Sequence, residues 1–162
     1  MFPADLIRLA EEIRDAYAAR GLWLATAESC TGGLIAGSLT AVSGSSAIVD
    51  RGFVTYTNDA KTEMLGVPAG LIAELGAVSG PVAEAMAQGA VAHSRADVGV
   101  AVTGIAGPTG GSEAKPVGLV FIARARKGGE TVVERHVFPG NRDAVRLATV
   151  RRALELLRDG VA

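Results

Sequence analysis

Glu28-Ser29-Cys30-Thr31-Gly32-Gly33 decides the fold of this chain, because it separates two apolar runs of different kinds. The run 22–27 is nearly continuous and apolar, which is typical of a strand covered on both faces. The run 34–42 follows the glycines and reads as a helix. Glycines allow a sharp turn, and the free amides that begin a helix can hold a phosphate or an oxyanion. Ser29 or Thr31 could instead serve only as a helix cap, so a structural role and a catalytic role both stay open.

The composition indicates one α/β domain. A chain of 162 residues suits a single domain, which buries about 70% of its unfolded surface. Apolar residues make up 49% and aromatic residues only 4%, so the core must consist mainly of alanine and aliphatic side chains, as in packed α/β layers. The net charge of -1 provides no basic surface for nucleic acid or for an anionic membrane.

The single cysteine, Cys30, excludes an internal disulfide and a thiol cluster for structural zinc. The segment 1–5 lacks the basic and apolar regions of a secretory signal, and no apolar run approaches about 20 residues. We therefore expect a soluble cytoplasmic protein that binds neither nucleic acid nor a membrane.

Hydrophobic periodicity predicts alternating helices and strands. The expected helices are 5–20, 34–42, 59–65, 68–76, 81–94 and 143–158, and the expected strands are 22–27, 48–56, 97–103, 117–124 and 131–138. The segment 126–130, with Gly128 and Gly129, predicts a hairpin between the last two strands. The hairpin makes the sheet mixed. There is no repeat, low-complexity tract or linker, so residues 1–162 are expected to form a single three-layer α/β/α domain.

The chain offers few groups that could activate Ser29. The only histidines, His93 and His136, lie far from it in sequence, which argues against a serine-histidine triad, and neither has a carboxylate at ligand spacing for a metal site. Lys61 falls in the first turn of the helix expected at 59–65, for which Asn58 is the expected N-cap.

Lys61 lies where the helix macrodipole disfavours a cation, which together with burial would lower the pKa of its amine. If the strands that precede Ser29 and Lys61 are neighbours, both residues emerge at one edge of the sheet, and the lysine could act as base for the serine. Tyr56 could hydrogen-bond within that pair. Two alternatives stay open: Lys61 could be an ordinary exposed lysine, and Cys30 could compete as the nucleophile or be a small buried side chain.

A second glycine-rich loop, 104–111, follows the strand expected at 97–103. It lacks the lysine and hydroxyl residue that close a nucleotide-hydrolase phosphate loop, and no convincing helix follows it as a dinucleotide fingerprint requires. Its place at the carboxyl end of a predicted parallel strand matches that of the Ser29 loop.

The ordered motifs closely resemble the CinA C-terminal domain family. They are Glu28-Ser29-Cys30-Thr31-Gly32-Gly33, Gly52 with Tyr56, Asn58 and Lys61, Leu65-Gly66-Val67, Gly76-Ala77-Val78-Ser79, and Val102-Thr103-Gly104-Ile105-Ala106-Gly107-Pro108. The resemblance spans nearly the whole chain. It implies a three-layer α/β/α sandwich with a mixed, mostly parallel five-stranded sheet.

The resemblance also implies an activity, since the family includes stand-alone nicotinamide mononucleotide amidohydrolases. These release ammonia from the carboxamide and leave nicotinic acid mononucleotide, in pyridine nucleotide salvage. Ser29 would be the nucleophile, Lys61 its general base and Tyr56 a supporting residue, with no cofactor and no metal. The residues expected around the substrate are Glu28, Cys30, Thr31, Gly32, Gly33, Thr103, Gly104, Ile105, Ala106, Gly107 and Arg142. Arg142 is a candidate for the phosphate because guanidinium matches phosphate geometry.

One departure from the family pattern is Gly80, where relatives usually carry glutamate. If that glutamate orients the site or a subunit contact, the chain could be an inactive nucleotide-binding module or a competence-associated interaction domain. The resemblance further implies a homodimer. Because the family domain is often joined to a larger N-terminal domain, we expect either a free-standing enzyme or one half of a split system.

Overall fold

The sheet places both glycine-rich loops at one end of the molecule. The computed structural model describes residues 1–162. Five strands lie in the order β2-β1-β3-β4-β5. They are β1 (Leu24–Glu28), β2 (Val49–Val54), β3 (Val98–Gly104), β4 (Leu119–Arg126) and β5 (Thr131–Val137). β1 pairs in parallel with β2 and β3, whereas β4 pairs antiparallel with β3 and β5, so only β4 runs against the other four.

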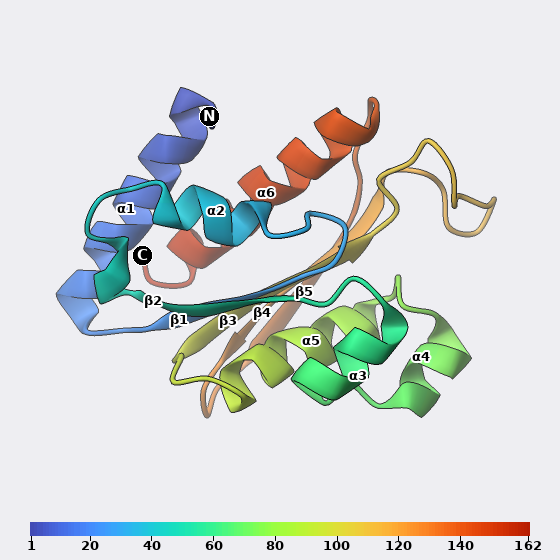
Figure 1. Cartoon of the computed structure of the whole chain (residues 1–162), viewed down its shortest axis with the longest axis horizontal. Coiled ribbons are helices and arrows are strands. Elements are labelled where there is room, and N and C mark those ends of the chain that lie inside the picture. Colours follow the sequence, from blue (N-terminus) through green and yellow to red (C-terminus); the bar gives the residue numbers. More distant parts are fainter.

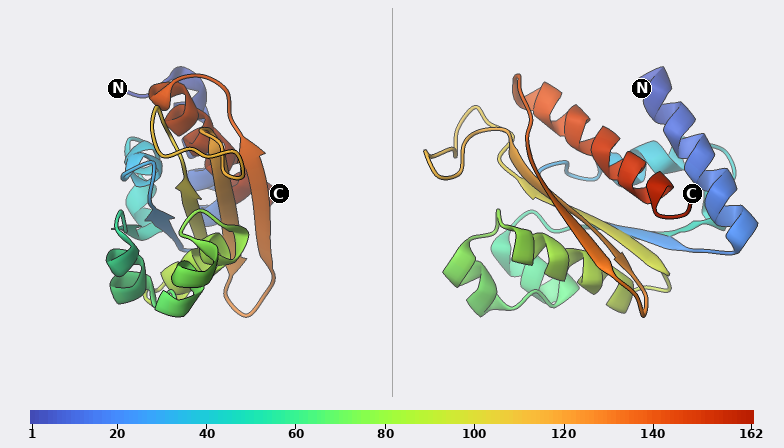
Figure 2. Two further views of the ribbon diagram at one scale, coloured as in Figure 1. Left: turned by 90° about the vertical axis from the view of Figure 1, so that its right-hand side faces the viewer. Right: turned by 180° about the vertical axis from the view of Figure 1, so that it is seen from behind.

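Helices cover both faces of this sheet, as Figures 1 and 2 show. One face carries α1 (Ala4–Arg20), α2 (Leu34–Thr40) and α6 (Arg142–Asp159). The other carries α3 (Asn58–Leu65), α4 (Ala69–Leu75) and α5 (Gly80–Ala92). A short 3-10 turn, Ser45–Ala47, precedes β2. The predicted α/β/α sandwich with a mixed sheet is confirmed.

β1 is an interior strand, flanked by β2 and β3, and all five of its residues are buried. Successive side chains of a strand point to opposite faces, so its residues divide between two cores. Leu24 joins a cluster with residues of α1 and α6, while Ala25 and Ala27 join a cluster with residues of α5. The small alanines let α5 lie close to the sheet. This double burial explains why the sequence before Ser29 is apolar without alternation.

The observed elements differ from the expected ones mainly at their ends. The prediction that Asn58 caps α3 is wrong, because Thr57 is the cap and its hydroxyl accepts a hydrogen bond from the Ala60 amide at 3.1 Å. The last helix, expected at 143–158, begins one residue earlier, because Arg142 is the first residue of α6 and Asn141 caps it. No helix combines the length and the apolar character that crossing a bilayer requires.

Both histidines make local contacts away from Ser29. The Nδ1 atom of His93 lies 2.9 Å from the Gly89 carbonyl. The Nε2 atom of His136 lies 2.8 Å from Glu134, and its ring stacks on Phe138. Neither histidine therefore completes a triad with Ser29.

Candidate active site

Ser29 and Lys61 meet because β1 and β2 are parallel neighbours. The register pairs Glu28 with Val54, and the amide of Thr55 continues the ladder to the Glu28 carbonyl at 2.9 Å. Ser29 thus follows one strand at the level where the chain leaves the other strand for α3. The carboxyl ends of adjacent parallel strands bring their loops to one edge, so the condition stated for a contact between Ser29 and Lys61 is met.

A hydrogen bond joins the two side chains. The Nζ atom of Lys61 lies 3.0 Å from the Oγ atom of Ser29, and it donates to the Thr55 carbonyl at 2.8 Å. The Tyr56 carbonyl lies 3.4 Å from the same nitrogen. Lys61 is 1% exposed, which rules out the alternative of an ordinary exposed lysine, whereas Ser29 is 9% exposed and borders a cavity.

The surroundings of Lys61 favour a neutral amine. Burial lowers the pKa of Lys61 from its ordinary value, because the ammonium form loses its hydration. No salt bridge compensates, since its nitrogen faces two carbonyls and one hydroxyl. A neutral amine can donate to the two carbonyls and still accept from the Ser29 hydroxyl. This arrangement is that of a base poised to take the serine proton.

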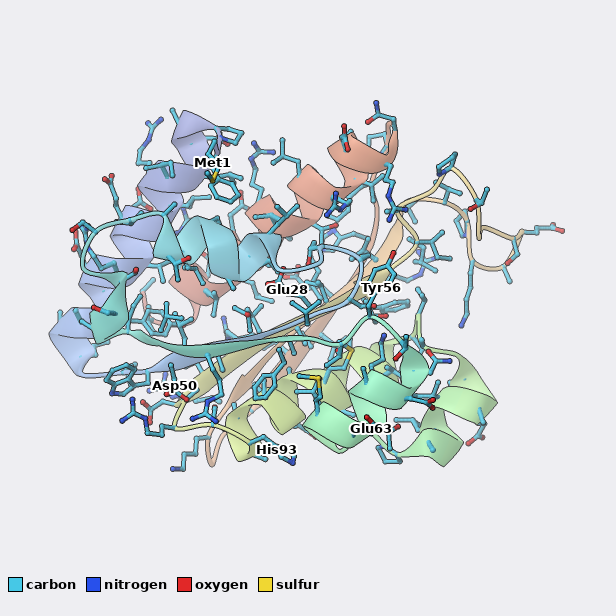
Figure 3. All side chains as sticks on the ribbon, viewed as in Figure 1. Met1, Glu28, Asp50, Tyr56, Glu63 and His93 are labelled. Carbon is cyan, nitrogen blue, oxygen red and sulfur yellow. The ribbon has the colours of Figure 1, made fainter.

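Glu28 joins the loop after Ser29 to the N-terminus of α2. Its carboxylate is fully buried and accepts from the Thr31 hydroxyl at 2.6 Å and from the amides of Ile35 and Ala36 at 2.8 and 3.0 Å. Figure 3 shows Glu28 between the sheet and α2. A carboxylate at a helix N-terminus satisfies the free amides and the macrodipole. Glu28 therefore anchors α2 and does not reach the cavity, in contrast to its expected place around the substrate.

Cys30 borders the cavity beside Ser29, but its thiol is 95% covered. Burial raises the pKa of the Cys30 thiol to about 11. The thiol form, which is a poor nucleophile, consequently dominates at neutral pH. Ser29 remains the better nucleophile of the two.

The cavity next to Ser29 has a volume of about 250 Å³. Its lining residues come from the Ser29 loop, the β2–α3 connection, the second glycine-rich loop and the start of α6: Ser29, Cys30, Tyr56, Gly104, Ile105, Ala106, Gly107, Thr109, Gly110 and Arg142. A second hollow of about 470 Å³ shares Ala106 and Arg142 with it and extends along the N-terminus of α6. The two glycine-rich loops thus form opposite walls of one site.

Besides Glu28, four residues expected around the substrate do not line this cavity: Thr31, Gly32, Gly33 and Thr103. Thr31 and Thr103 are buried, and the Thr103 hydroxyl donates to the Ala77 carbonyl at 2.9 Å. Gly32 and Gly33 have φ angles of 58° and 102°, which only glycine adopts without strain. Thr31, Gly32 and Gly33 therefore shape the turn behind Ser29, whereas Thr103 ties β3 to the segment before α5.

Tyr56 and Arg142 meet at the mouth of the cavity. The Tyr56 ring is 60% exposed, and its hydroxyl accepts from the Nη2 atom of Arg142 at 3.2 Å. Arg142 also donates to the Gly107 carbonyl at 2.8 Å. The phenol makes no hydrogen bond to Ser29 or Lys61, so only the backbone of Tyr56 supports that pair. In Figure 3, Tyr56 lies near the end of the sheet from which the long β3–β4 connection projects.

Sequence reasoning missed Arg146. Its Nε atom donates to the Cys30 carbonyl at 3.1 Å and its Nη2 atom donates to the Thr31 carbonyl at 3.3 Å. The spacing of four residues from Arg142 could have revealed it, because residues i and i+4 share one face of a helix. Thr109 and Gly110, also missed, belong to the loop 104–111 that was singled out.

Comparisons with known proteins find related sequences over nearly the whole chain. The sequence model of the CinA C-terminal domain matches residues 6–161. A curated protein of Escherichia coli strain K12, nicotinamide-nucleotide amidohydrolase PncC, is 50% identical over 157 residues, which cover 97% of this chain and 95% of that protein. A CinA-like protein of Citrifermentans bemidjiense is 57% identical over 138 residues, which cover 85% of this chain and 33% of that protein.

Solved structures share the whole fold. The competence/damage inducible protein CihA from Agrobacterium tumefaciens superposes with a TM-score of 0.95 at 54% identity, covering 97% of this chain and 96% of its own. A CinA superfamily protein from Escherichia coli superposes with a TM-score of 0.91 at 36% identity, covering 98% of this chain and 93% of its own.

Proposed function

The chain belongs to the CinA C-terminal domain family, and on that premise we propose that it hydrolyses the carboxamide of nicotinamide mononucleotide. The products are nicotinic acid mononucleotide and ammonia, a step of pyridine nucleotide salvage. The observation that carries the proposal is the 3.0 Å contact between the buried Lys61 amine and the Ser29 hydroxyl, at the wall of a cavity. The amidohydrolase name of the Escherichia coli relative, which matches over nearly its full length, supports the same reaction.

In the first half of the reaction, Ser29 attacks the carboxamide carbon while Lys61 accepts the hydroxyl proton. The carbonyl π pair moves onto oxygen and gives a tetrahedral oxyanion. When this intermediate collapses, the C–N bond breaks and Lys61 returns the proton to the leaving nitrogen, which departs as ammonia. An acyl ester on Ser29 remains.

The oxyanion needs hydrogen-bond donors that are free before the reaction. Cys30, Ala106 and Gly107 border the cavity, and their backbone amides donate to no other residue. The amide of the residue after a nucleophile commonly serves this purpose. We assign the Cys30 amide as one donor, with the second taken from the loop of Ala106 and Gly107.

In the second half, water attacks the ester carbon and gives its proton to Lys61. The ester C–O bond breaks, Lys61 returns the proton to the Ser29 oxygen, and the carboxylic acid product leaves. Water thus supplies the hydroxyl of the product, and the enzyme ends unchanged.

The hollow along α6 suits the ribose phosphate. Arg142 provides a guanidinium at the boundary of the two spaces, and the N-terminus of α6 provides free amides. Arg142 already donates to the Gly107 carbonyl and the Tyr56 hydroxyl. A bound phosphate would therefore either replace one of these two acceptors or share the guanidinium with them. The substrate then spans from Ser29 to α6.

The test is ammonia release from nicotinamide mononucleotide by the purified chain, beside Ser29→Ala. Turnover by the wild type and none by Ser29→Ala is expected. A silent wild-type chain that binds the nucleotide would replace the proposal with a binding module. Turnover by Ser29→Ala equal to that of the wild type would reject Ser29 as the nucleophile.

A further inference from the structure

Two arginines of α6, Arg142 and Arg146, have no carboxylate partner, and only Arg146 contacts the segment after Ser29. Arg151, Arg152 and Arg158 on the same helix each contact a carboxylate within 4 Å. Arg146 forms no ion pair, and its hydrogen bonds go only to the carbonyls of Cys30 and Thr31. A half-buried guanidinium without a counterion, directed at two adjacent carbonyls, indicates a function in holding that segment.

The segment that Arg146 holds is the turn immediately after Ser29. The Gly32 amide donates to the Ser29 carbonyl at 3.0 Å, which closes the turn around Cys30 and Thr31. Glu28 accepts from the Thr31 hydroxyl, and Arg146 donates to the two central carbonyls from α6. The Thr31 carbonyl also accepts from the Leu34 amide at 3.1 Å, whereas Arg146 is the only donor to the Cys30 carbonyl. The anionic Glu28 thus contacts the turn through the Thr31 side chain, and the cationic Arg146 contacts it through backbone carbonyls.

Because the peptide group is planar, the contacts of Arg146 with the two carbonyls also orient the amides that follow them. In a trans peptide the carbonyl and the following N–H point in opposite directions. With the Cys30 carbonyl directed at Arg146, the Thr31 amide must point away from α6. With the Thr31 carbonyl also directed there, the Gly32 amide points back to Ser29, where it donates. Hydrogen bonds from a charged donor are about twice as strong as neutral ones, so rotation of either peptide is strongly disfavoured.

We propose that Arg146 is a positioning residue that locks the turn of the nucleophile, so that the Ser29 hydroxyl stays on the Lys61 amine and the Cys30 amide stays free. This inference rests on the proposed function. Arg146 does not line the cavity, so it acts through the turn and not on the substrate. A misplacement of about 1 Å at a reacting group can cost about 100-fold in rate.

The test compares Arg146→Ala, Arg146→Lys and Arg151→Ala. Arg151 is the matched control, since it lies on the same helix but pairs with Asp5 of α1. Arg146→Ala should lower kcat by about 10-fold to 100-fold with little change in KM, because the cavity walls remain. Arg146→Lys should lower kcat less than Arg146→Ala does. Ethylguanidinium added to Arg146→Ala should restore part of the lost kcat. Arg151→Ala should keep the kcat of the wild type.

A second readout does not depend on the substrate. The rate at which a fluorophosphonate labels Ser29, followed by mass spectrometry, should fall in Arg146→Ala and recover with ethylguanidinium. If the wild type does not hydrolyse nicotinamide mononucleotide, the proposed function fails and these labelling rates alone decide on Arg146. If Arg146→Ala has the labelling rate and the kcat of the wild type, the inference is overturned. It is also overturned if the loss of labelling and kcat matches the unfolded fraction of the variant and ethylguanidinium does not restore them.

Discussion

Replacing Lys61 with methionine removes the amine beside Ser29 while keeping a long, buried side chain. The substitution deletes the hydrogen bonds to the Ser29 hydroxyl and the Thr55 carbonyl. Because methionine is unbranched and flexible, it can fill the same space without strain. The fold should therefore survive, and the change isolates the proton transfer.

The expected loss follows from the proposed task of Lys61. A positioned general base typically contributes a factor of about 100 to about 10,000 in rate. At about 1.4 kcal/mol per tenfold, this corresponds to about 3 to 5 kcal/mol of activation free energy. We expect kcat of Lys61→Met to fall within this range, with KM little changed because Lys61 does not line the cavity.

The pH dependence of kcat/KM and of stability tests the role of Lys61 more specifically than the loss of kcat does. Burial lowers the pKa of Lys61 below its ordinary value of 10.5, so the active neutral amine forms at lower pH than in a free lysine. The wild-type kcat/KM should rise with pH and level off below 10.5. Stability should change at higher pH, between the lowered pKa of folded Lys61 and 10.5, because the unfolded lysine binds the proton more tightly. The free energy of unfolding should therefore rise from the lowered pKa up to 10.5.

Lys127→Met is the control, since Lys127 is exposed on the hairpin between β4 and β5. It should keep both the turnover and the pH profile of the wild type. Lys61→Met should lose the rising limb of kcat/KM and the corresponding slope in stability. A Lys61→Met variant that retains turnover within about threefold, or keeps that limb, would refute Lys61 as the base.

Three other substitutions separate structural from catalytic residues. Glu28→Gln should cost about 2 to 3 kcal/mol in chemical denaturation, because three donors to a buried carboxylate lose their charged acceptor; an unchanged midpoint would contradict this role. Cys30→Ala should keep turnover within about threefold, and iodoacetamide at pH 7 should leave the wild type active, since the thiol pKa is about 11. Gly80→Glu should raise stability by about 1 kcal/mol, because Gly80 begins α5 and its Cβ would meet only side-chain atoms of Phe121 and Val133 at 3.7 Å or more. Its turnover should equal that of the wild type, and a clear gain would show that the family's glutamate serves the site.

Much of the fold could be predicted because its patterns are local. The continuous apolar run of β1 and the glycines after Glu28 indicated a buried strand followed by a turn, and α1 and α6 showed helical periodicity. Membership of the CinA C-terminal domain family, predicted from ordered motifs, is confirmed. Helix ends were less accurate, since Thr57 and Asn58 are both good caps and only the three-dimensional path of the chain selects Thr57.

The site was predictable where it depends on strand order. Parallel pairing of β1 and β2 brings Ser29 and Lys61 together. The sequence predicted this meeting only on the condition that the two strands are neighbours, and the structure meets that condition. The directions of side chains were not predictable. Glu28 and Ser29 are adjacent, yet one points to α2 and the other to Lys61. Arg146 was missed because its contact with Cys30 spans 116 positions, and no local pattern reports such a contact.

The most direct test of Ser29 as the nucleophile is to catch the acyl ester on it. Wild-type protein mixed with nicotinamide mononucleotide is quenched in acid within one turnover, and the digested peptides are measured by mass spectrometry. We predict a nucleotide acyl adduct on the peptide that contains Ser29, absent from Ser29→Ala and formed more slowly by Lys61→Met. Ammonia release at the wild-type rate with no adduct on that peptide, under conditions where acylation outpaces hydrolysis, would contradict the mechanism.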